Sequence, residues 1–347
     1  MKKNILRISC LVVFTSFLLS FSLYDSEKEV PYLVKEFNAS QIKSLNVETS
    51  GGGITVEGGN ESTAKVEVYI KGSNWKSNLS KEDIASKLSE YDFSVDLASG
   101  TLSCIAKRKE HKNDWKNGLS ISFKVFVPTK INTDLHTSGG GIELKSLKGD
   151  IQFRTSGGGL NLTGISGNVK GKTSGGGITM YDCHEILDLY TSGGGISVDK
   201  ASGTLSLKTS GGGLNLSNIS GNINAKTSGG GVDARDIKGE LITSTTGGSI
   251  HLEGIAGNVE ARTSGGNIHA DVLSFNNFLT LSTSGGNIVV DMPLNKGMDL
   301  DISGENINTP AFTNFNGTKS KKVLGGTING GGAKVQLSAN SGNVTIK

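Results

Sequence analysis

The sequence predicts an all-β fold, a single-stranded parallel β-helix (solenoid) built from 18-residue coils. Three observations predict it. A Thr-Ser-Gly-Gly-Gly block recurs every 18 residues from Thr137 to Thr263, and its last two copies drift to Thr-Thr-Gly-Gly-Ser and Thr-Ser-Gly-Gly-Asn. Aliphatic residues recur every nine residues between these blocks, and a second apolar residue usually follows two positions later. A fixed period of this size is typical of stacked repeats, in which no repeat buries its apolar face alone.

The nine-residue spacing predicts a buried column of side chains. Apolar residues at i and i+2 with polar residues between them indicate a half-buried strand. We therefore expect two short strands per coil, stacked in parallel at a spacing of ~4.8 Å. A second column runs from Leu144 to Ala270 and is broken only by Gly171 and Thr243, and a third occurs once per coil from Leu147 to Leu273. The stations of the first column are Ile142, Ile151, Leu160, Val169, Ile178, Leu187, Ile196, Leu205, Leu214, Ile223, Val232, Leu241, Ile250, Val259 and Ile268.

The glycine blocks predict the corners of the coils. The middle glycine, as in Gly140, never changes, whereas the next position drifts to Ser249, Asn267 and Asn287. Gly and Asn tolerate left-handed backbone, so we expect a tight corner with positive φ. The threonine that opens each block lies two residues after an inward-facing residue of the preceding strand, so its side chain should also point inward. We expect these threonines to stack as a ladder whose hydroxyls bond along the column.

The chain divides into five predicted segments. A basic start followed by an apolar stretch from Ile8 to Leu23 predicts a secretory signal peptide, with an uncleaved membrane anchor as the rival interpretation. A capping-box pattern that opens at Ser80 predicts a helix near 81–90 that caps the solenoid against edge pairing. The predicted segments are a signal peptide (1–22), a leader (23–43), N-terminal strands and cap (44–136), a regular solenoid (137–291), and irregular C-terminal coils with a second cap (292–347).

Charge and cysteine content restrict the functional class. Without residues 1–22 the chain has 32 basic and 32 acidic residues, so it lacks the positive excess that non-specific nucleic-acid binding requires. Of the two remaining cysteines, Cys183 occupies an inward station, which favours a buried free thiol over a Cys104–Cys183 disulfide.

From about Phe37 to Lys347 the sequence resembles a bacterial “putative adhesin” family of glycine-rich domains of unknown function. The resemblance is carried by the Ser-Gly-Gly-Gly-Ile corners, by Val-Phe-Val-Pro at 125–128 and by the Ile-Asn-Gly-Gly-Gly ending with Ser-Gly-Asn-Val at 328–344. It implies a right-handed parallel β-helix exposed at the cell envelope, and it implies no catalytic residues.

Motifs for catalysis are largely missing. No Lys-Ser or Lys-Thr follows a glycine triplet, no Gly-x-Ser-x-Gly elbow is present, and the five histidines suggest no triad. No cofactor is therefore expected. One outward file places His251 and His269 in register, with Glu253 and Asp271 two residues further on. This cluster, with Asp233 one coil before His251, could hold a divalent metal, but a solvated polar strip is the favoured interpretation.

A second outward file is rich in cations. Spacing by 18 places Arg154, Lys172, Lys208, Lys226 and Arg262 on one column, together with His136, Tyr190 and Ser244. Adjacent cations repel one another unless something offsets them. This file is the predicted contact strip for an acidic glycan or another envelope component.

These observations favour an exported, non-enzymatic, adhesin-like or structural protein of the cell envelope, located in the periplasm, at the outer surface or outside the cell. Its repetitive polar surface would bind through many weak contacts. The alternative is a polysaccharide-binding or polysaccharide-degrading β-helix protein, although 18-residue coils offer little material for cleft walls. No nucleic acid is expected as a partner, nor integration into the membrane once the signal is removed, and the pattern leaves the oligomeric state open.

Overall fold

The computed structural model describes residues 30–59, 61–73, 79–109 and 118–347. The chain separates into two units, Met1–Val30 and Pro31–Lys347. The predicted signal peptide (1–22) and Cys10 lie outside the described residues, and the account below concerns the second unit. In the described part of the chain, no helix combines the length and the apolar character needed to cross a bilayer.

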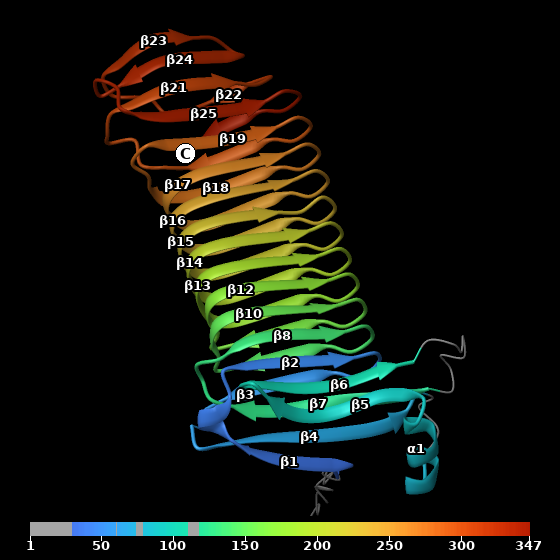
Figure 1. Cartoon of the computed structure of the whole chain (residues 1–347). Coiled ribbons are helices and arrows are strands. Elements are labelled where there is room, and N and C mark those ends of the chain that lie inside the picture. Colours follow the sequence, from blue (N-terminus) through green and yellow to red (C-terminus); the bar gives the residue numbers. More distant parts are fainter. Residues whose placement is uncertain (1–29, 60, 74–78, 110–117) are drawn as a thin grey trace, which may run out of the picture. The chain divides into compact units, whose positions relative to one another are not determined.

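The second unit is a parallel β-solenoid, as predicted (Figure 1). Equivalent residues of successive coils pair directly, for example Ile196 with both Ile178 and Leu214. The early coils have two separate strands, from Ile178 to Thr263 the two merge into one long bent strand per coil, and the coil of β18 and β19 again has two. The strands of the regular region are β8 (Asn132–Thr137), β9 (Ile142–Lys145), β10 (Lys148–Thr155), β11 (Leu160–Thr163), β12 (Ser166–Thr173), β13 (Ile178–Thr191), β14 (Ile196–Thr209), β15 (Leu214–Lys226), β16 (Val232–Thr245), β17 (Ile250–Thr263), β18 (Ile268–Ser274), β19 (Phe278–Thr283) and β20 (Ile288–Asp291).

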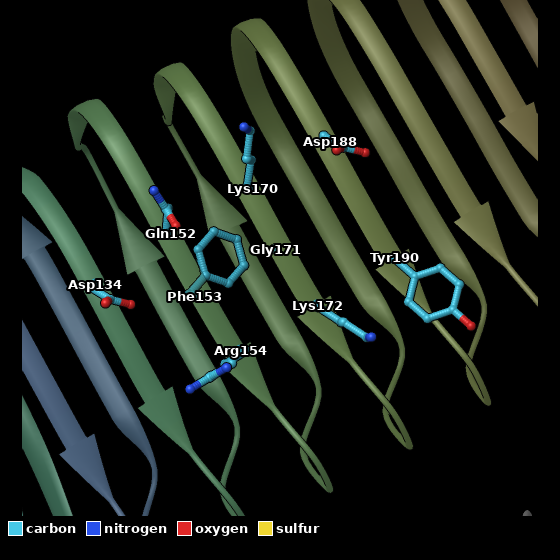
Figure 2. Close-up of a pocket in the computed structure, with 9 residues that line it drawn as sticks. All are labelled: Asp134, Gln152, Phe153, Arg154, Lys170, Gly171, Lys172, Asp188 and Tyr190. Atoms are coloured by element: carbon cyan, nitrogen blue, oxygen red, sulfur yellow. The ribbon is translucent and has the colours of Figure 1, made fainter.

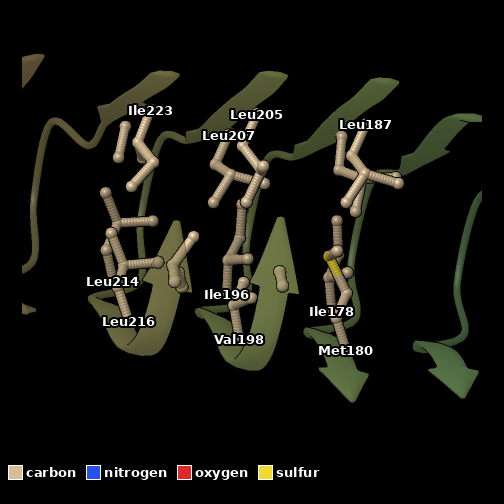
Figure 3. Close-up of a cluster of buried hydrophobic side chains, with 14 of the residues drawn as sticks. Ile178, Met180, Leu187, Ile196, Val198, Leu205, Leu207, Leu214, Leu216 and Ile223 are labelled. Carbon is tan, nitrogen blue, oxygen red and sulfur yellow. The ribbon is translucent and has the colours of Figure 1, made fainter. Parts of the chain in front are cut away.

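The predicted columns form the core (Figure 3). None of the fifteen nine-apart stations is more than 2% exposed, and burial of each such side chain contributes ~1.5–3 kcal/mol. The prediction that the third column is buried is correct up to Ile255 and wrong at Leu273, which is 61% exposed. Val272 fills that place, because the register shifts where β18 pairs with β17.

The glycine corners have a different cause from the one predicted. None of the glycines in these blocks has a positive φ, and neither does Ser249, Asn267 or Asn287. Instead, successive corners stack in close contact. A Cβ on Gly158 would lie 2.2 Å from the carbonyl oxygen of Gly140, and the equivalent contacts in the other coils are similarly short. The middle position therefore requires glycine because another backbone occupies the space of a side chain.

Positive φ values occur at the two other bends of each 18-residue coil. The first bend is occupied mostly by polar residues such as Asp182 and Asn218, with φ near +55°. The second bend is glycine in every 18-residue coil except one, where Glu185 has φ +81°. The glycines of this second file are Gly149, Gly167, Gly203, Gly221, Gly239 and Gly257.

The threonines form the predicted ladder, with a more specific partner. The hydroxyl of Thr209 donates to the carbonyl oxygen of Gly194 in the preceding coil at 2.6 Å and accepts from the backbone N–H of Gly212. Thr155, Thr173 and later threonines repeat this arrangement. Each buried hydroxyl therefore ties its own corner to the one before it.

The N-terminal coils do not follow sequence order. The coil of β2 and β3 lies between the coil of β6 and β7 and that of β8 and β9. Antiparallel strands then close this end: β4 pairs with β7, β5 with β6, and β1 with β4. The bounds are β1 (Leu33–Asn38), β2 (Ser44–Thr49), β3 (Ile54–Gly58), β4 (Thr63–Gly72), β5 (Tyr91–Ala98), β6 (Thr101–Arg108) and β7 (Leu119–Val127).

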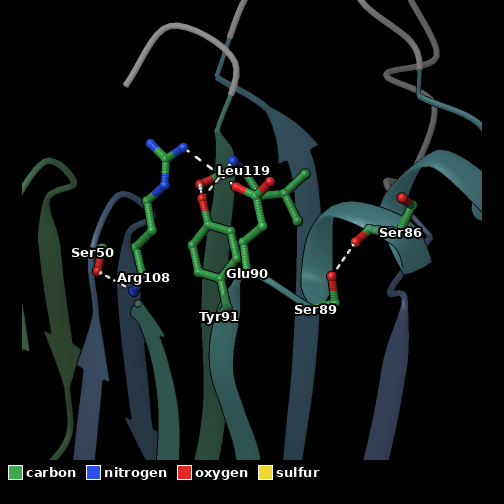
Figure 4. Close-up of polar contacts among 7 residues, drawn as sticks. All are labelled: Ser50, Ser86, Ser89, Glu90, Tyr91, Arg108 and Leu119. Atoms are coloured by element: carbon green, nitrogen blue, oxygen red, sulfur yellow. Dashed lines mark hydrogen bonds and ion pairs between the residues drawn. The ribbon is translucent and has the colours of Figure 1, made fainter. Parts of the chain in front are cut away.

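Two expectations for this end can be compared with the structure. Part of the predicted leader (23–43) instead forms β1 and a 3-10 turn, Ala39–Gln41, because its alternating apolar residues pack on the core. The predicted helix is present as α1 (Lys81–Leu88), and Ser80 and Asp83 form its capping box. In β5, the strand that follows the helix, the hydroxyl of Tyr91 accepts from the N–H of Leu119 at 2.7 Å (Figure 4).

The C-terminal coils are also interleaved. The coil of β25 (Ala333–Ala339) and β26 (Val344–Ile346) lies between β19–β20 and the coil of β21 and β22. Antiparallel β24 and β23 close this end. The bounds are β21 (Met298–Ser303), β22 (Ile307–Asn308), β23 (Phe315–Lys319) and β24 (Val323–Ile328).

Asparagines replace the third glycine of the corner in these last coils. The side-chain oxygen of Asn267 accepts from the N–H of Asn287, and that of Asn287 accepts from the N–H of Asn343, both at 2.8 Å. Asn306 then donates to Asn343. The drift from glycine to asparagine therefore builds a side-chain ladder on the outside of the corner.

Candidate functional site

The predicted cation strip lies on one face of the solenoid. On β10, Ile151, Phe153 and Thr155 point inward, so that Gln152 and Arg154 point outward. The strand register continues the file of Arg154 from coil to coil. The structure thus brings all five predicted site residues into one file, which we call the cation strip: Arg154, Lys172, Lys208, Lys226 and Arg262.

The strip retains most of its positive charge. Only Arg262 has an acidic partner among the described residues, the carboxylate of Glu260 at 2.9 Å. Arg154 instead lies 3.1 Å from Nδ1 of His136. Partial burial, together with the Arg154 charge, lowers the pKa of His136 and favours its neutral form. Lys208 and Lys226 form no ion pair within the described residues, so their charges face solvent.

A file of serines borders the strip. Each threonine of the ladder points inward, and the following residue therefore points outward next to the cation file. These serines are mostly exposed and repeat at every coil: Ser156, Ser174, Ser192, Ser210 and Ser228. Cations and hydroxyls therefore alternate across this face in a constant pattern.

Tyr190 occupies the strip between Lys172 and Lys208. Its hydroxyl accepts from Ser192 at 3.1 Å and lies 3.4 Å from Ser210, which fixes the ring direction. The Lys172 ammonium lies 5.3 Å from the ring centroid, within the range of a cation–π contact. The bond from Ser192, then that with Ser210 and the lysine charges lower the pKa of the Tyr190 phenol.

An open depression of about 420 Å³ lies along this part of the strip (Figure 2). Phe153 and Gly171 contribute its floor, and Arg154, Lys170 and Lys172 surround it. Residue 171 is the glycine that interrupts the second apolar column. The ring of Phe153 uses the vacated space, because a Cβ on Gly171 would lie 2.3 Å from its Cε2.

The strand face formed by β9, β11, the first halves of β13 to β17, β18 and β20 has the opposite charge. Asp199, Asp233, Glu253, Asp271 and Asp291 occupy its two outward files. Arg235 neutralises part of this charge by pairing with Asp233 at 3.2 Å and with Glu253 at 3.3 Å. The solenoid is thus polarised, with one basic face and one acidic face.

The predicted histidine cluster forms, but it is not arranged as a metal site. The rings of His251 and His269 stack with centroids 5.2 Å apart and 24° between their planes. Glu253 is paired with Arg235, and Asp271 accepts from the backbone N–H of Gly254. Within the described residues, no group of three or more His, Cys, Asp or Glu side chains is placed to hold a metal ion.

One histidine corrects the expectation that no triad-like set exists. Nδ1 of His184 lies 2.8 Å from Ser202 Oγ, and its Nε2 lies 3.3 Å from a carboxylate oxygen of Asp182. The serine meets Nδ1 rather than Nε2, and about half of the Asp182 side chain is exposed. Water therefore competes for each bond, and the trio stabilises the bend that contains Glu185 without enclosing a reaction site.

Both cysteines of the second unit are buried free thiols, which removes the alternative of a Cys104–Cys183 disulfide. Burial raises the pKa of Cys104 to about 12 and also raises the pKa of Cys183. Neither thiol is a reactive group in the folded chain.

Residues 181–347 match the family described as Toastrack DUF4097. This stretch, just under half of the chain, is similar to that family. The resemblance drawn from the corners and the C-terminal ending is thereby confirmed. The matched stretch includes Lys208, Lys226 and Arg262, whereas Arg154 and Lys172 precede it. No curated protein matches the chain.

Three solved structures align with much of the chain at low identity. A “putative cell adhesion protein” from Clostridium sporogenes is 11% identical, with 91% of this chain and 97% of that chain covered and a TM-score of 0.20. A “putative adhesin” from Parabacteroides distasonis is 13% identical, with 74% and 96% covered and a TM-score of 0.31. A “putative lipid binding protein” from the same organism is 12% identical, with 92% and 98% covered and a TM-score of 0.31. These likenesses are too distant to carry a functional argument.

The depression was not predicted from the sequence, although the strip was. Gln152, Lys170 and Asp188 line it and belong to the file two residues before the strip. The signal that could have indicated it is the break at Gly171, which is followed one coil later by the aromatic Tyr190 in the strip.

Proposed function

We propose that the protein is an exported, non-enzymatic, adhesin-like component of the cell envelope that binds an acidic polysaccharide along the cation strip. The observation that carries this proposal is the file of five cations, of which only Arg262 has an acidic partner among the described residues. Export rests on the predicted signal peptide at 1–22.

The spacing of the strip suits a linear polymer. Successive coils lie ~4.8 Å apart, which is close to the length of one sugar residue in an extended chain. The repeated serine hydroxyls supply further hydrogen-bonding groups. A polymer that meets several cations at once gains affinity from the second and later contacts without any single deep pocket.

Charge and geometry favour binding over hydrolysis. Asp134 and Asp188 both line the depression, but three coil spacings, ~14 Å, separate them along one file. Glycosidases that use two carboxylates hold them ~5–9.5 Å apart. The pair therefore does not suit the polysaccharide-degrading alternative.

The proposal is tested by titrating the purified chain with polygalacturonate, and with dextran as a neutral polymer, in a calorimeter at two salt concentrations. We expect salt-sensitive binding of the acidic polymer alone. A Lys208→Glu/Lys226→Glu variant should bind at least tenfold more weakly, because it reverses two strip lysines that lack an ion pair within the described residues. Lys238→Glu/Lys334→Glu is the matched control, because it makes the same charge change at exposed lysines outside the strip.

Two outcomes would contradict this function. One is the absence of binding to polygalacturonate and to a sulfated polymer such as heparin. The other is equal weakening by the strip variant and the control, which would mean that net charge alone governs attraction. Fractionation of the native cells tests export separately: a cytoplasmic location would remove the envelope assignment.

A further inference from the structure

The depression in the strip has a floor, a charged rim and an aromatic wall. Its floor lies at Gly171, and the Phe153 ring, which is only 4% exposed, fills the space directly beneath that glycine. A concave surface with a few convergent polar groups is the usual arrangement of a small-molecule site.

The rim places three cations together. Arg154 belongs to one coil, and Lys170 and Lys172 belong to the next coil. Lys170 and Lys172 form no ion pair within the described residues, and Arg154 contacts only the imidazole of His136. The centre of the depression is therefore positive and suits an anionic group.

The ends of the depression limit the charge that it can accept. Asp134 lies at one end, where it pairs with Gln152, and Asp188 lies at the other end, where it pairs with Lys170. These carboxylates would repel a phosphate monoester, which carries a charge of about −1.5 to −2. They would accept hydrogen bonds from neutral hydroxyls, as would the side-chain oxygen of Gln152.

Tyr190 provides the wall. Ser192 and Ser210 hold its hydroxyl, and the Lys172 ammonium lies against its ring, so little conformational freedom remains to be lost on binding. A flat aromatic face beside hydroxyl-binding groups fits the apolar side of a sugar ring.

We propose that this depression binds one acidic sugar residue that carries a single carboxylate, of the uronic-acid type. Arg154 and Lys172 receive the carboxylate, Tyr190 packs against the sugar ring, and Gln152 and Asp188 bind its hydroxyls. The inference rests on the proposed function and deepens it, because it gives the polymer a defined anchoring residue within the strip.

The test uses a short ligand that cannot span the strip. Tetragalacturonate is titrated into the full chain at physiological salt, beside its methyl ester and a sulfated tetrasaccharide. Tyr190→Ser, which copies Ser244 of the same file, should weaken tetragalacturonate binding at least tenfold. Lys226→Ala, a strip residue outside the depression, should change it less than twofold. Thermal unfolding of both variants controls for folding.

The outcomes separate the two proposals. Equal weakening by both variants, or binding of the long polymer without binding of the tetramer, overturns the acidic-sugar site and leaves the strip intact. Equal affinity for the methyl ester, or tighter binding of the sulfated tetrasaccharide, overturns the assignment of a carboxylate. If neither tetramer nor polymer binds, the proposed function fails as well.

Discussion

The hydroxyl of Thr137 donates a 2.6 Å hydrogen bond to the carbonyl oxygen of Gly52, which lies 85 residues earlier in the chain. Thr155 makes the same bond to Gly140 over only 15 residues. The block that begins at Thr49 is therefore a full member of the stack, in register with Thr137. The same threonine–glycine hydrogen bond therefore forms whether its two residues are near or far apart in the sequence, since a segment with this block can occupy a place in the stack.

The middle glycine of the corner is expected to be irreplaceable. In Gly212→Ala, the new Cβ would lie 2.3 Å from the backbone nitrogen of Gly195. Two coils would have to separate, and we expect a loss of ~3 kcal/mol or more in the free energy of unfolding, measured by urea denaturation. Gly213→Ala is the control, with a nearest contact of 3.2 Å at a position that holds Ser249 in a later coil. Equal effects of the two variants would refute close packing as the reason for the glycine.

The threonine ladder is expected to contribute measurably to stability. Thr209→Val keeps the shape of the side chain but removes its bonds with Gly194 and Gly212. Since a buried group left without its partner costs ~1–3 kcal/mol, we expect the free energy of unfolding, measured by urea denaturation, to fall by that amount. Ser228→Ala removes an exposed hydroxyl at the same corner of the next coil and should change stability by less than ~0.5 kcal/mol. A Thr209→Val chain as stable as the wild type would contradict this role.

Adjacent coils should respond differently at the second bend. Gly203 has φ +113°, and a Cβ there would lie 2.1 Å from the carbonyl oxygen of Glu185, so Gly203→Ala should cost ~3 kcal/mol or more. In the preceding coil the same bend position is Glu185, which already has a Cβ, so Glu185→Ala adds no atom there. It loses only an exposed pair with Lys148, which is worth ~0–1 kcal/mol. Thermal unfolding of the two variants measures the difference, and similar melting temperatures would argue against it.

The buried Cys104 should make the fold sensitive to alkali. Burial, followed by the charge of Asp96, raises its pKa from 9.0 to about 12. The folded state therefore holds this proton more tightly than the unfolded state, and stability is complete below pH 9 and declines as the pH rises from 9 toward 12. At pH 10 the contribution lost is about 1.4 kcal/mol.

Urea denaturation at pH 7 and pH 10 measures this loss, with Cys104→Val as the comparison. The variant has no thiol to ionise at this position, so its stability should fall less between the two pH values. An identical decrease in both chains would show that other groups cause the alkaline sensitivity.

Much of the fold could be predicted from sequence, because its main signal is local and repeated. The inward columns that begin at Ile142 and Leu144 follow from the alternation of side chains along a strand, and so does the outward direction of the cation strip. The cause of the glycine corners could not be distinguished, since positive φ and close backbone approach both select glycine. Leu273 was misplaced because this coil departs from the 18-residue period: Val272 pairs with Ile255 after only 17 residues, whereas Thr283 pairs with Thr263 after 20.

Other features depend on contacts that periodicity does not encode. The order of coils at both ends requires knowledge of which distant strands pair. The second glycine file, with its exception at Glu185, repeats every 18 residues and could have been recognised. The depression depends on how Phe153 fills the space beneath Gly171. From the spacing of the sequence, Gly171 is recognised only as a break in the second apolar column.

The position of β25 and β26 has a consequence for biosynthesis. Residues 298–308 are translated before residues 333–346, yet they lie one layer further from the centre of the stack. They cannot reach their final partners until the later segment has emerged and inserted. Growth of this protein from its first coil to its last, one layer at a time in the order of translation, is therefore impossible, and the distal layers must assemble as a late, concerted event.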